Sequence, residues 1–414
     1  MRGGRRRWLA GGGLAAVIVV AVVLVSRSGS GHPGRAPVSP TTVSSSGTTT
    51  SSTVATSTTL SSTTTPAVTL APARPAPPGE HFGASVNLLF NAGTVPPPQI
   101  AAQLQALRAT GATIARSDAL WEASEPSPPV NGVHTFAWTF DDTIAGDLAA
   151  HHLRWEPILG YSAPWAVSIP GQDHSPPASD ADYAAYAGAF ATRYGPGGTF
   201  WREHPALTAE PVETYEIWNE PDLGIFWTPA PDAARYADLY IAARVAIDAA
   251  QPDARVIVGG LTQPTNFIPE LLAARPQLNG HIDGFAIHPY GRPLVVLDKI
   301  RADRETLTSL GMGSVPLYVT EFGWTTTPPG ALNYVPAAQR PDYISQVVTA
   351  LGHLDCGLAT AIIYTWFSPG GDPTNSEDWF GIDSPSGAPT ADSAAFTRAL
   401  RRDRGAAATL PLCR

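Results

Sequence analysis

The chain has 414 residues, 43% of them hydrophobic and 15% charged, which is enough for one large domain or two ordinary ones with a sizeable buried core. Lys299 is the only lysine, which nearly excludes mechanisms that use a phosphate-loop or Schiff-base lysine. Residues 80–414 hold 35 acidic and 19 basic side chains, and this excess of negative charge argues against a nucleic-acid partner.

The N-terminal segment reads as an export signal. Four of the first seven residues are arginine, and residues 8–25 form an apolar run without charge that is just long enough to span a bilayer as a helix. Because positive flanks stay in the cytoplasm, we predict a signal anchor over residues 1–26 and an extracytoplasmic location for the rest. A cleaved signal peptide, which would give a secreted protein, is the alternative.

Residues 27–79 have the composition of a linker. Between positions 41 and 65, 20 of 25 residues are Ser or Thr, and a proline-rich stretch follows at 66–78. Such a sequence cannot bury enough apolar surface to offset the entropy of ordering it. We therefore predict a disordered, extended stalk over 27–79 and a single folded domain over 80–414.

After position 80, short apolar runs alternate with amphipathic helical segments, the pattern of a parallel sheet with helical crossovers. The predicted strands cover 82–88, 112–118, 153–160, 214–218, 255–260, 283–288, 316–321 and 361–366. Eight such units in about 330 residues predict an α/β fold, a (β/α)8 TIM barrel. A doubly wound open sheet is the alternative, although no Gly-x-Gly-x-x-Gly follows the first strand.

Two glutamates lie where predicted strands end. Glu220 stands in Trp-Asn-Glu-Pro after the fourth strand, and Glu321 stands in Thr-Glu-Phe-Gly at the end of the seventh. In a TIM barrel the carboxyl ends of the strands form the active site. Two carboxylic acids across a barrel mouth suit glycoside cleavage, in which one protonates the leaving oxygen while the other attacks the anomeric carbon or activates water.

These two motifs resemble the acid/base and nucleophile motifs of the clan A retaining glycoside hydrolases, and the similarity extends over residues 80–400. The resemblance implies that Glu220 is the acid/base and Glu321 the nucleophile. It also assigns expected substrate-binding or orienting roles to Arg116, Asn219, His288, Tyr290 and Trp366. In that pattern Arg116 orients the nucleophile, the Tyr290 hydroxyl reaches it, Asn219 binds a sugar hydroxyl, and Trp366 forms an aromatic floor under the sugar, followed by a cis peptide bond at Phe367.

A further set of residues resembles family 39 of that clan, which includes hydrolases of bacterial exopolysaccharide operons, with family 5 as a neighbour. The residues are Trp121, Glu125-Pro126, Gly132, Phe136-Ala137-Trp138, Asp141-Asp142, Leu159-Gly160-Tyr161 and Trp165.

Tryptophans provide the argument for a sugar-binding cleft. Trp165, Trp227 and Trp324 fall in loops after predicted strands and Trp366 ends the eighth, positions where an exposed indole face could stack on a sugar ring. Neither a His-Glu-x-x-His motif nor a Cys-x-x-Cys pair occurs, so we expect neither a metal nor another cofactor.

The sequence thus predicts a monomeric retaining β-glycosidase that acts by double displacement on an extracellular or cell-envelope polysaccharide. The retaining reaction requires the two carboxyls to lie about 5 to 5.5 Å apart. A weakly catalytic or non-catalytic glycan-binding barrel, or a transglycosylase, is the alternative.

Cys356 and Cys413 are the only cysteines, and we predict that they form a disulfide because an even number of cysteines in an exported protein is usually paired. Two separate buried thiols are the alternative.

Overall fold

A computed structural model of the chain describes residues 69–76, 81–91, 93–403 and 410–413. The predicted signal anchor at 1–26 and the greater part of the predicted linker lie outside these residues. Contacts define a compact unit that runs from Leu70 to Arg414. Within the described ranges, no helix is both long and apolar enough to cross a membrane.

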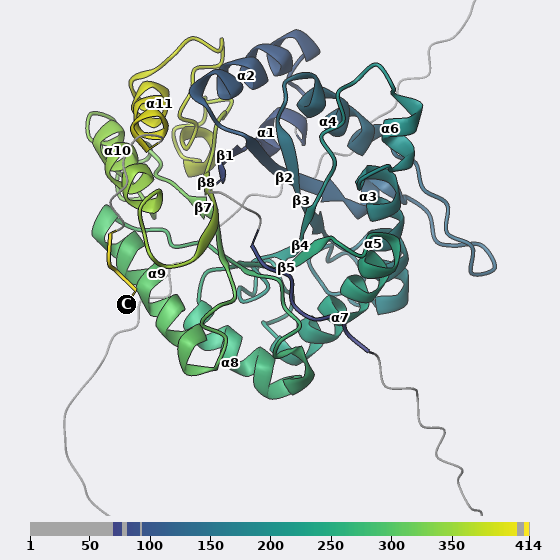
Figure 1. The fold of residues 1–414 in the computed structure, drawn as a ribbon. Coiled ribbons are helices and arrows are strands. Elements are labelled where there is room, and N and C mark those ends of the chain that lie inside the picture. Colours follow the sequence, from purple (N-terminus) through teal and green to yellow (C-terminus); the bar gives the residue numbers. More distant parts are fainter. Residues whose placement is uncertain (1–68, 77–80, 92, 404–409, 414) are drawn as a thin grey trace, which may run out of the picture. The chain divides into compact units, whose positions relative to one another are not determined.

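The folded unit is a closed barrel of eight parallel strands, arranged in chain order and surrounded by helices (Figure 1). The strands are β1 (His81–Ser85), β2 (Ile114–Leu120), β3 (Arg154–Gly160), β4 (Thr214–Asn219), β5 (Arg255–Leu261), β6 (Phe285–Ile287), β7 (Leu317–Phe322) and β8 (Leu358–Ile363). Since β1 pairs with β8 as well as with β2, the sheet has no edge. The predicted (β/α)8 barrel is therefore confirmed, and the open-sheet alternative is wrong.

One long helix follows each strand. These helices are α2 (Pro97–Thr110), α4 (Thr139–Ala150), α5 (Asp180–Tyr194), α7 (Ala233–Ala250), α8 (Pro264–Ala274), α9 (Pro293–Ser309), α10 (Arg340–Leu351) and α11 (Ala391–Asp403). Shorter turns are α1 (Asn87–Phe90), α3 (Trp121–Ser124), α6 (Thr199–Glu203) and the 3₁₀ helices η1 (Pro276–Leu278) and η2 (Ser376–Trp379).

Helix α5 shows how the sequence specifies these elements. Ser179 caps its N-terminus by accepting a hydrogen bond from the backbone N–H of Asp182. Tyr183, Tyr186 and Phe190 recur at spacings of three and four, and all are fully buried against the barrel. The helix thus buries one aromatic face while its other side remains partly exposed.

Residues 70–76, which we call the base strap, bind the amino-terminal end of the barrel beside β5 and α7 (purple in Figure 1). The backbone N–H of Arg74 donates to Asp283 at 2.7 Å, and its guanidinium pairs with Asp248, also at 2.7 Å. Asp283 is fully buried and also pairs with Arg244 at 2.6 Å.

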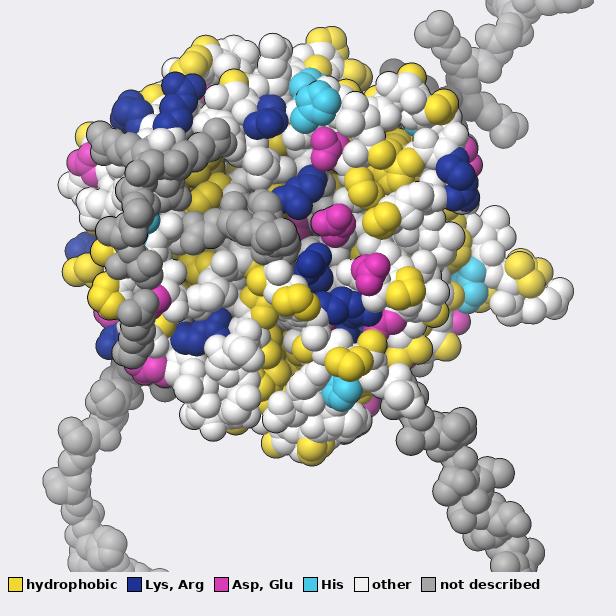
Figure 2. Space-filling view, in the orientation of Figure 1, with side chains coloured by type: hydrophobic (Ala, Val, Ile, Leu, Met, Phe, Trp, Pro, Cys, Tyr) yellow, Lys and Arg dark blue, Asp and Glu magenta, His cyan; other side chains and the backbone are white. Residues whose placement is uncertain are grey.

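Acidic and basic side chains are interspersed across the middle of the face shown in Figure 2.

The base strap corrects the predicted domain boundary. Composition placed residues 70–76 in the linker, whereas the structure makes them part of the folded unit. The proline-rich sequence is ordered here because its backbone groups and the Arg74 side chain find partners on the barrel, such as the Arg255 guanidinium, which donates to the Pro75 carbonyl at 2.9 Å.

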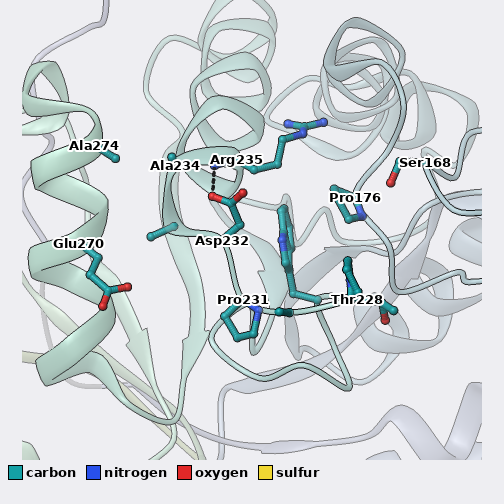
Figure 3. Close-up of a pocket in the computed structure, with 13 residues that line it drawn as sticks. Ser168, Pro176, Thr228, Pro231, Asp232, Ala234, Arg235, Glu270 and Ala274 are labelled. Carbon is teal, nitrogen blue, oxygen red and sulfur yellow. Dashed lines mark hydrogen bonds between the residues drawn. The ribbon is translucent and has the colours of Figure 1, made fainter. Parts of the chain in front are cut away.

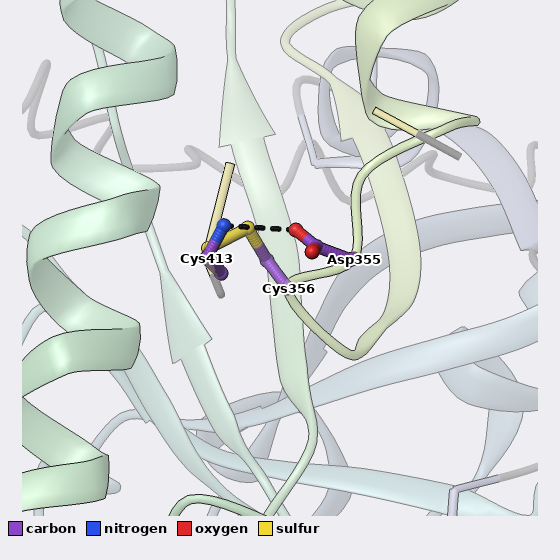
Figure 4. Close-up of side chains that lie close together, drawn as sticks. All are labelled: Asp355, Cys356 and Cys413. Atoms are coloured by element: carbon purple, nitrogen blue, oxygen red, sulfur yellow. Dashed lines mark hydrogen bonds between the residues drawn. A yellow bond between two sulfur atoms is a disulfide. The ribbon is translucent and has the colours of Figure 1, made fainter. Parts of the chain in front are cut away.

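Cys356 and Cys413 form a disulfide, as predicted (Figure 4). Their Cα atoms lie 5.1 Å apart, and Cys356 precedes β8 by two residues. One carboxylate oxygen of Asp355 accepts hydrogen bonds from the backbone N–H groups of Leu412 and Cys413, each at 2.8 Å. The bond and these contacts fasten the C-terminal segment to the start of the last strand.

Candidate active site

Glu220 and Glu321 lie at the carboxyl ends of β4 and β7 and are 8% exposed each. One carboxylate oxygen from each, together with a ring nitrogen of His288, forms a group whose atoms all lie within 4.8 Å of one another. Glu220 and the preceding Trp218 have positive φ angles of 47° and 67°, an uncommon backbone conformation for residues other than glycine that occurs often at functional sites. The chain thus brings together the two acids that the sequence analysis singled out.

Glu321 accepts hydrogen bonds on both carboxylate oxygens, which stabilises its ionised form. Arg116 Nη1 donates to Oε1 at 2.6 Å, and the Tyr290 hydroxyl donates to Oε2 at 2.7 Å. Burial raises the pKa of this carboxyl, but the charges of His288 and Arg116 and these hydrogen bonds outweigh burial and hold the pKa below its ordinary value. Glu321 is therefore a carboxylate near neutral pH.

Glu220 has the opposite environment. Its Oε1 lies 2.7 Å from His288 Nδ1, while His288 Nε2 lies 3.1 Å from the Thr320 hydroxyl. Burial raises the pKa of Glu220, and the negative charge of Glu321 raises it further against the opposing effect of His288. The same two carboxylates raise the pKa of His288, although burial alone would lower it. A proton is thus held between Glu220 and His288.

Gly260 on β5 makes room for this histidine. A Cβ atom at position 260 would lie 2.0 Å from His288 Nε2, far closer than any permitted contact. The imidazole can reach Glu220 only because this position lacks a side chain.

Arg116, fully buried on β2, links Glu321 to Glu216, a residue that the sequence analysis missed. Its Nε donates to Glu216 Oε2 at 2.7 Å and its Nη2 donates to Glu216 Oε1 at 2.9 Å. Nη2 also donates to Asn219 Oδ1 at 3.0 Å, which leaves the Asn219 Nδ2 group to donate to a ligand. Glu216 lies three residues before Asn219 in the same strand. The sequence signal that could have identified it is a charged residue between apolar neighbours in a buried strand.

The aromatic predictions are corrected in part. Trp366 is 1% exposed and donates its indole N–H to the Gln103 carbonyl on α2. Trp324 and Trp227 are 2% and 1% exposed, and Trp324 donates to the Gly291 carbonyl. All three indoles belong to the buried core, which leaves Trp324 and Trp366 without an exposed face for a sugar, while Trp227 also lines the pocket described below. Trp165 is partly exposed and packs edge-on against Trp121.

The residue after β8 that borders the acids is Tyr364 rather than Trp366. Its hydroxyl donates to Glu377 at 2.7 Å, and the negative charge of Glu321 contributes to raising the pKa of Tyr364. The cis peptide bond of this segment joins Tyr364 to Thr365, not Trp366 to Phe367. A side chain two positions earlier than predicted therefore lies beside the acids.

Two further carboxyls lie close enough to Glu321 for its negative charge to raise their pKa values. Burial raises the pKa of Glu377 to about 7 and that of Asp118 to about 6, with Glu321 contributing to both. Asp118 follows Arg116 by two residues on β2 and accepts a hydrogen bond from Asn91 at 2.5 Å. Because alternate strand residues share a face, the position of Asp118 could have been predicted from that of Arg116.

Glu220, His288 and Glu321 also have the spacing of a metal site. However, both oxygens of Glu321 accept hydrogen bonds from Arg116 and Tyr290, and the guanidinium is a cation in contact with the cluster. The arrangement fits proton transfer and nucleophilic attack better than cation binding.

A separate pocket of about 610 Å³ lies among the loops that follow β3 and β4 and the helices α7 and α8 (Figure 3). Asp232, Arg235 and Glu270 are among its lining residues, and Asp232 caps α7 by accepting from the Arg235 backbone N–H. Neither glutamate of the acid pair lines it, so this pocket is separate from the acid pair.

No protein-family model matches the sequence, and no curated protein does. Solved structures do match. The family 39 glycoside hydrolase from Xanthomonas axonopodis pv. citri is 20% identical with a TM-score of 0.59, over 78% of this chain and 67% of that one. A family 39 β-xylosidase from Caulobacter crescentus is 21% identical with a TM-score of 0.59, over 79% and 72%.

A family 5 (subfamily 18) structure from Bifidobacterium longum is 14% identical with a TM-score of 0.56, over 80% of this chain and 81% of that one. At these identities the likeness concerns the fold. The chain therefore has the barrel fold found in glycoside hydrolases of families 39 and 5, the clan A families that the sequence motifs resemble.

Proposed function

We propose that this protein is a retaining β-glycosidase in which Glu321 is the nucleophile and Glu220 the acid/base. The observation that carries the proposal is the contrast between two carboxyls whose oxygens approach within 4.8 Å: His288, Arg116 and Tyr290 hold the pKa of Glu321 below its ordinary value, whereas burial raises the pKa of Glu220, which shares a proton with His288. Pairs of acids whose environments separate their pKa values are typical of glycosidases, and a short separation favours direct attack over inversion by water.

In the first step, a carboxylate oxygen of Glu321 attacks the anomeric carbon and forms an ester. The bond from that carbon to the leaving oxygen breaks as Glu220 transfers its proton to the oxygen. In the second step, Glu220, now a carboxylate, takes a proton from water while the water oxygen displaces Glu321 from the anomeric carbon. Each step inverts the centre once, so the product retains its configuration.

The neighbours of the two acids support these roles. Tyr290 and Arg116 hold Glu321 on both of its oxygens, which orients the nucleophile. His288 holds Glu220 and is itself positioned by Thr320. The Asn219 side-chain oxygen accepts a hydrogen bond from Arg116, so its amide N–H group is the part that can donate to a sugar hydroxyl.

For the substrate, we propose an extracellular or cell-envelope polysaccharide reached by an enzyme that is exported and held by its N-terminal segment. The arginine-flanked apolar run and the Ser/Thr-rich stretch support export, and the Cys356–Cys413 disulfide suits an oxidising compartment. We further propose that the protein acts as a monomer, since both acids and the residues that contact them come from one barrel.

The test is a screen of 4-nitrophenyl β-glycosides of xylose, glucose, mannose and galactose, chosen because structures with this fold are described as xylosidases, a glucosidase, a mannosidase and galactanases. Glu321→Gln is the matched inactive control. Retained configuration of the first product, followed by NMR, supports the proposal, and an inverted first product contradicts it. Binding without turnover would favour a glycan-binding barrel, and transfer to added sugar would favour a transglycosylase.

A further inference from the structure

The charge balance around Arg116 must change during the proposed reaction. Arg116 is fully buried and contacts Glu321, which is negative in the free enzyme and neutral once it carries a sugar ester. A buried guanidinium left without any negatively charged partner is strongly destabilised. Some other group must therefore keep Arg116 paired while the ester exists.

Glu216 has the geometry for this task. It is fully buried, and both of its oxygens accept from Arg116, while the Gly260 backbone N–H donates to Oε1 at 2.7 Å. It precedes Asn219 by three residues in β4, so it lies back from the carboxyl end of the strand, where it has no exposed surface. Its charge is thus fixed on Arg116 and takes no part in bond making.

The guanidinium nitrogens of Arg116 also donate to different partners, and this arrangement fixes the orientation of the group. Glu216 takes Nε and Nη2, so Nη1 is left for Glu321 and a second interaction of Nη2 for Asn219. If the guanidinium rotated, both the nucleophile and the amide next to the acid would lose their partner.

We propose that Glu216 is a positioning residue that keeps Arg116 charge-paired through both steps, so that Glu321 can become a neutral ester without leaving a buried guanidinium unpaired. The inference rests on the proposed function, since only covalent catalysis removes the charge of Glu321.

Removing the charge of Glu216 has opposite effects on the two steps. Arg116 would then pair with Glu321 alone, which makes Glu321 a weaker nucleophile and destabilises its ester. Formation of the ester becomes slower and its hydrolysis becomes faster. Loss of a purely structural contact would instead slow both steps together.

The proposed role of Glu216 also predicts a change in the pKa of Glu321, which can be measured without a substrate. The titratable groups whose charges act on Glu321 or respond to it are Arg116, Asp118, Tyr161, Glu220, His288, Tyr290, Tyr364 and Glu377. With these groups unchanged, replacing Glu216 by Gln leaves the positive charge of Arg116 to act on Glu321 undivided. The pKa of Glu321 should fall by about 1 pH unit.

The kinetic experiment uses 2,4-dinitrophenyl 2-deoxy-2-fluoro-β-glycosides of xylose, glucose, mannose and galactose, which trap the ester for mass spectrometry. We expect Glu216→Gln to form the ester about tenfold more slowly than wild type and to release it faster. The matched control is Glu156→Gln on β3, which is also buried but has a pKa raised by burial to about 8, so the change removes no charge at pH 6. It should behave as wild type, and equal slowing of both steps by Glu216→Gln overturns the proposal.

Titration of ¹³C-labelled glutamate side chains by NMR, with Glu321 assigned by its loss in Glu321→Gln, measures the pKa directly. A lower Glu321 pKa in Glu216→Gln supports the proposal, and an unchanged one contradicts it. If no fluoroglycoside labels the wild type, the proposed function fails while this titration still decides the pairing. If Glu216→Gln does not fold, Glu216→Asp decides: the wild-type pKa is expected because the charge is kept, and a lowered one overturns the proposal.

Discussion

The Tyr290 hydroxyl and the Glu321 carboxylate form a 2.7 Å hydrogen bond on the oxygen that Arg116 leaves free. Because this bond helps to hold the pKa of Glu321 low, Tyr290→Phe should raise that pKa. We expect the acid limb of kcat/KM to move to higher pH and the plateau to fall by about tenfold to a hundredfold. An acid limb that stays in place would show that the hydroxyl does not act on Glu321.

The pH profile of the wild type should be bell-shaped. In the proposed reaction Glu321 acts without its proton, so activity should appear as the pH rises through the lowered pKa of Glu321 and be lost below it. It also requires the proton held between Glu220 and His288, so it declines as the pH rises through the raised pKa of that pair.

Glu220→Ala separates the two limbs. With a dinitrophenyl glycoside, whose leaving group needs no proton, and with azide as the nucleophile for the second step, this variant should keep the acid limb and lose the alkaline one. The expected product is a glycosyl azide of retained configuration. An alkaline limb that persists in Glu220→Ala would assign it to another group.

Those parts of the site that follow directly from local sequence could be predicted. Glu220 and Glu321 each stand at the end of an apolar strand, and parallel strands bring their carboxyl ends to one face. The eight strands were equally accessible because each is a short buried run. Arg116, His288 and Tyr290 were identified through their place in motifs, and the structure brings all three to the acids.

What failed depended on the direction of side chains rather than on their position in the chain. Trp366 was predicted to end the eighth strand and instead follows β8 by three residues; its indole faces α2, and Tyr364 lies beside the acids instead. Glu216 was missed because a carboxylate inside a strand becomes interpretable only when its buried partner is known. Composition predicted disorder for the base strap, whose order comes from contacts distant in sequence.

The tryptophans can be sorted by whether their loss affects binding or folding. Trp324→Ala and Trp366→Ala should each lower the free energy of unfolding by about 3 to 5 kcal/mol, because each empties a packed site. Trp165→Ala removes a partly exposed ring and should raise KM for a polysaccharide more than it lowers stability. Thermal melts and steady-state kinetics on the same three variants test this, and an unchanged KM in Trp165→Ala would remove Trp165 from the cleft.

The disulfide should contribute to stability rather than to activity. Cys356 and Cys413 are 57 residues apart, and closing a loop of that length stabilises a protein by roughly 3 to 4 kcal/mol in the chain-entropy description. Cys356→Ser/Cys413→Ser should therefore melt at a lower temperature and turn over substrate at the wild-type rate while folded. Mass analysis without reductant should find no free thiol in the wild type.

The base strap leads to the last prediction, which concerns where the folded domain begins. Arg74→Ala removes one cation from Asp283 and Asp248, but Asp283 keeps Arg244 and the backbone N–H of Val256. We expect a loss of about 1 to 3 kcal/mol from this change, since hydrogen bonds to charged groups contribute on that scale.

A chain that starts at Glu80 loses the whole strap, including the buried Leu70 and the backbone donor to Asp283, and should melt at a lower temperature than Arg74→Ala. A chain that starts at Thr69 keeps every one of these contacts and should melt with the full-length protein. Comparing the three by calorimetry therefore locates the boundary: equal melting temperatures for the chains starting at Thr69 and Glu80 would place it at Glu80, where composition alone puts it. A lower melting temperature confined to the shorter chain would place it at Leu70, because the two chains differ only in residues 69–79, which include the strap.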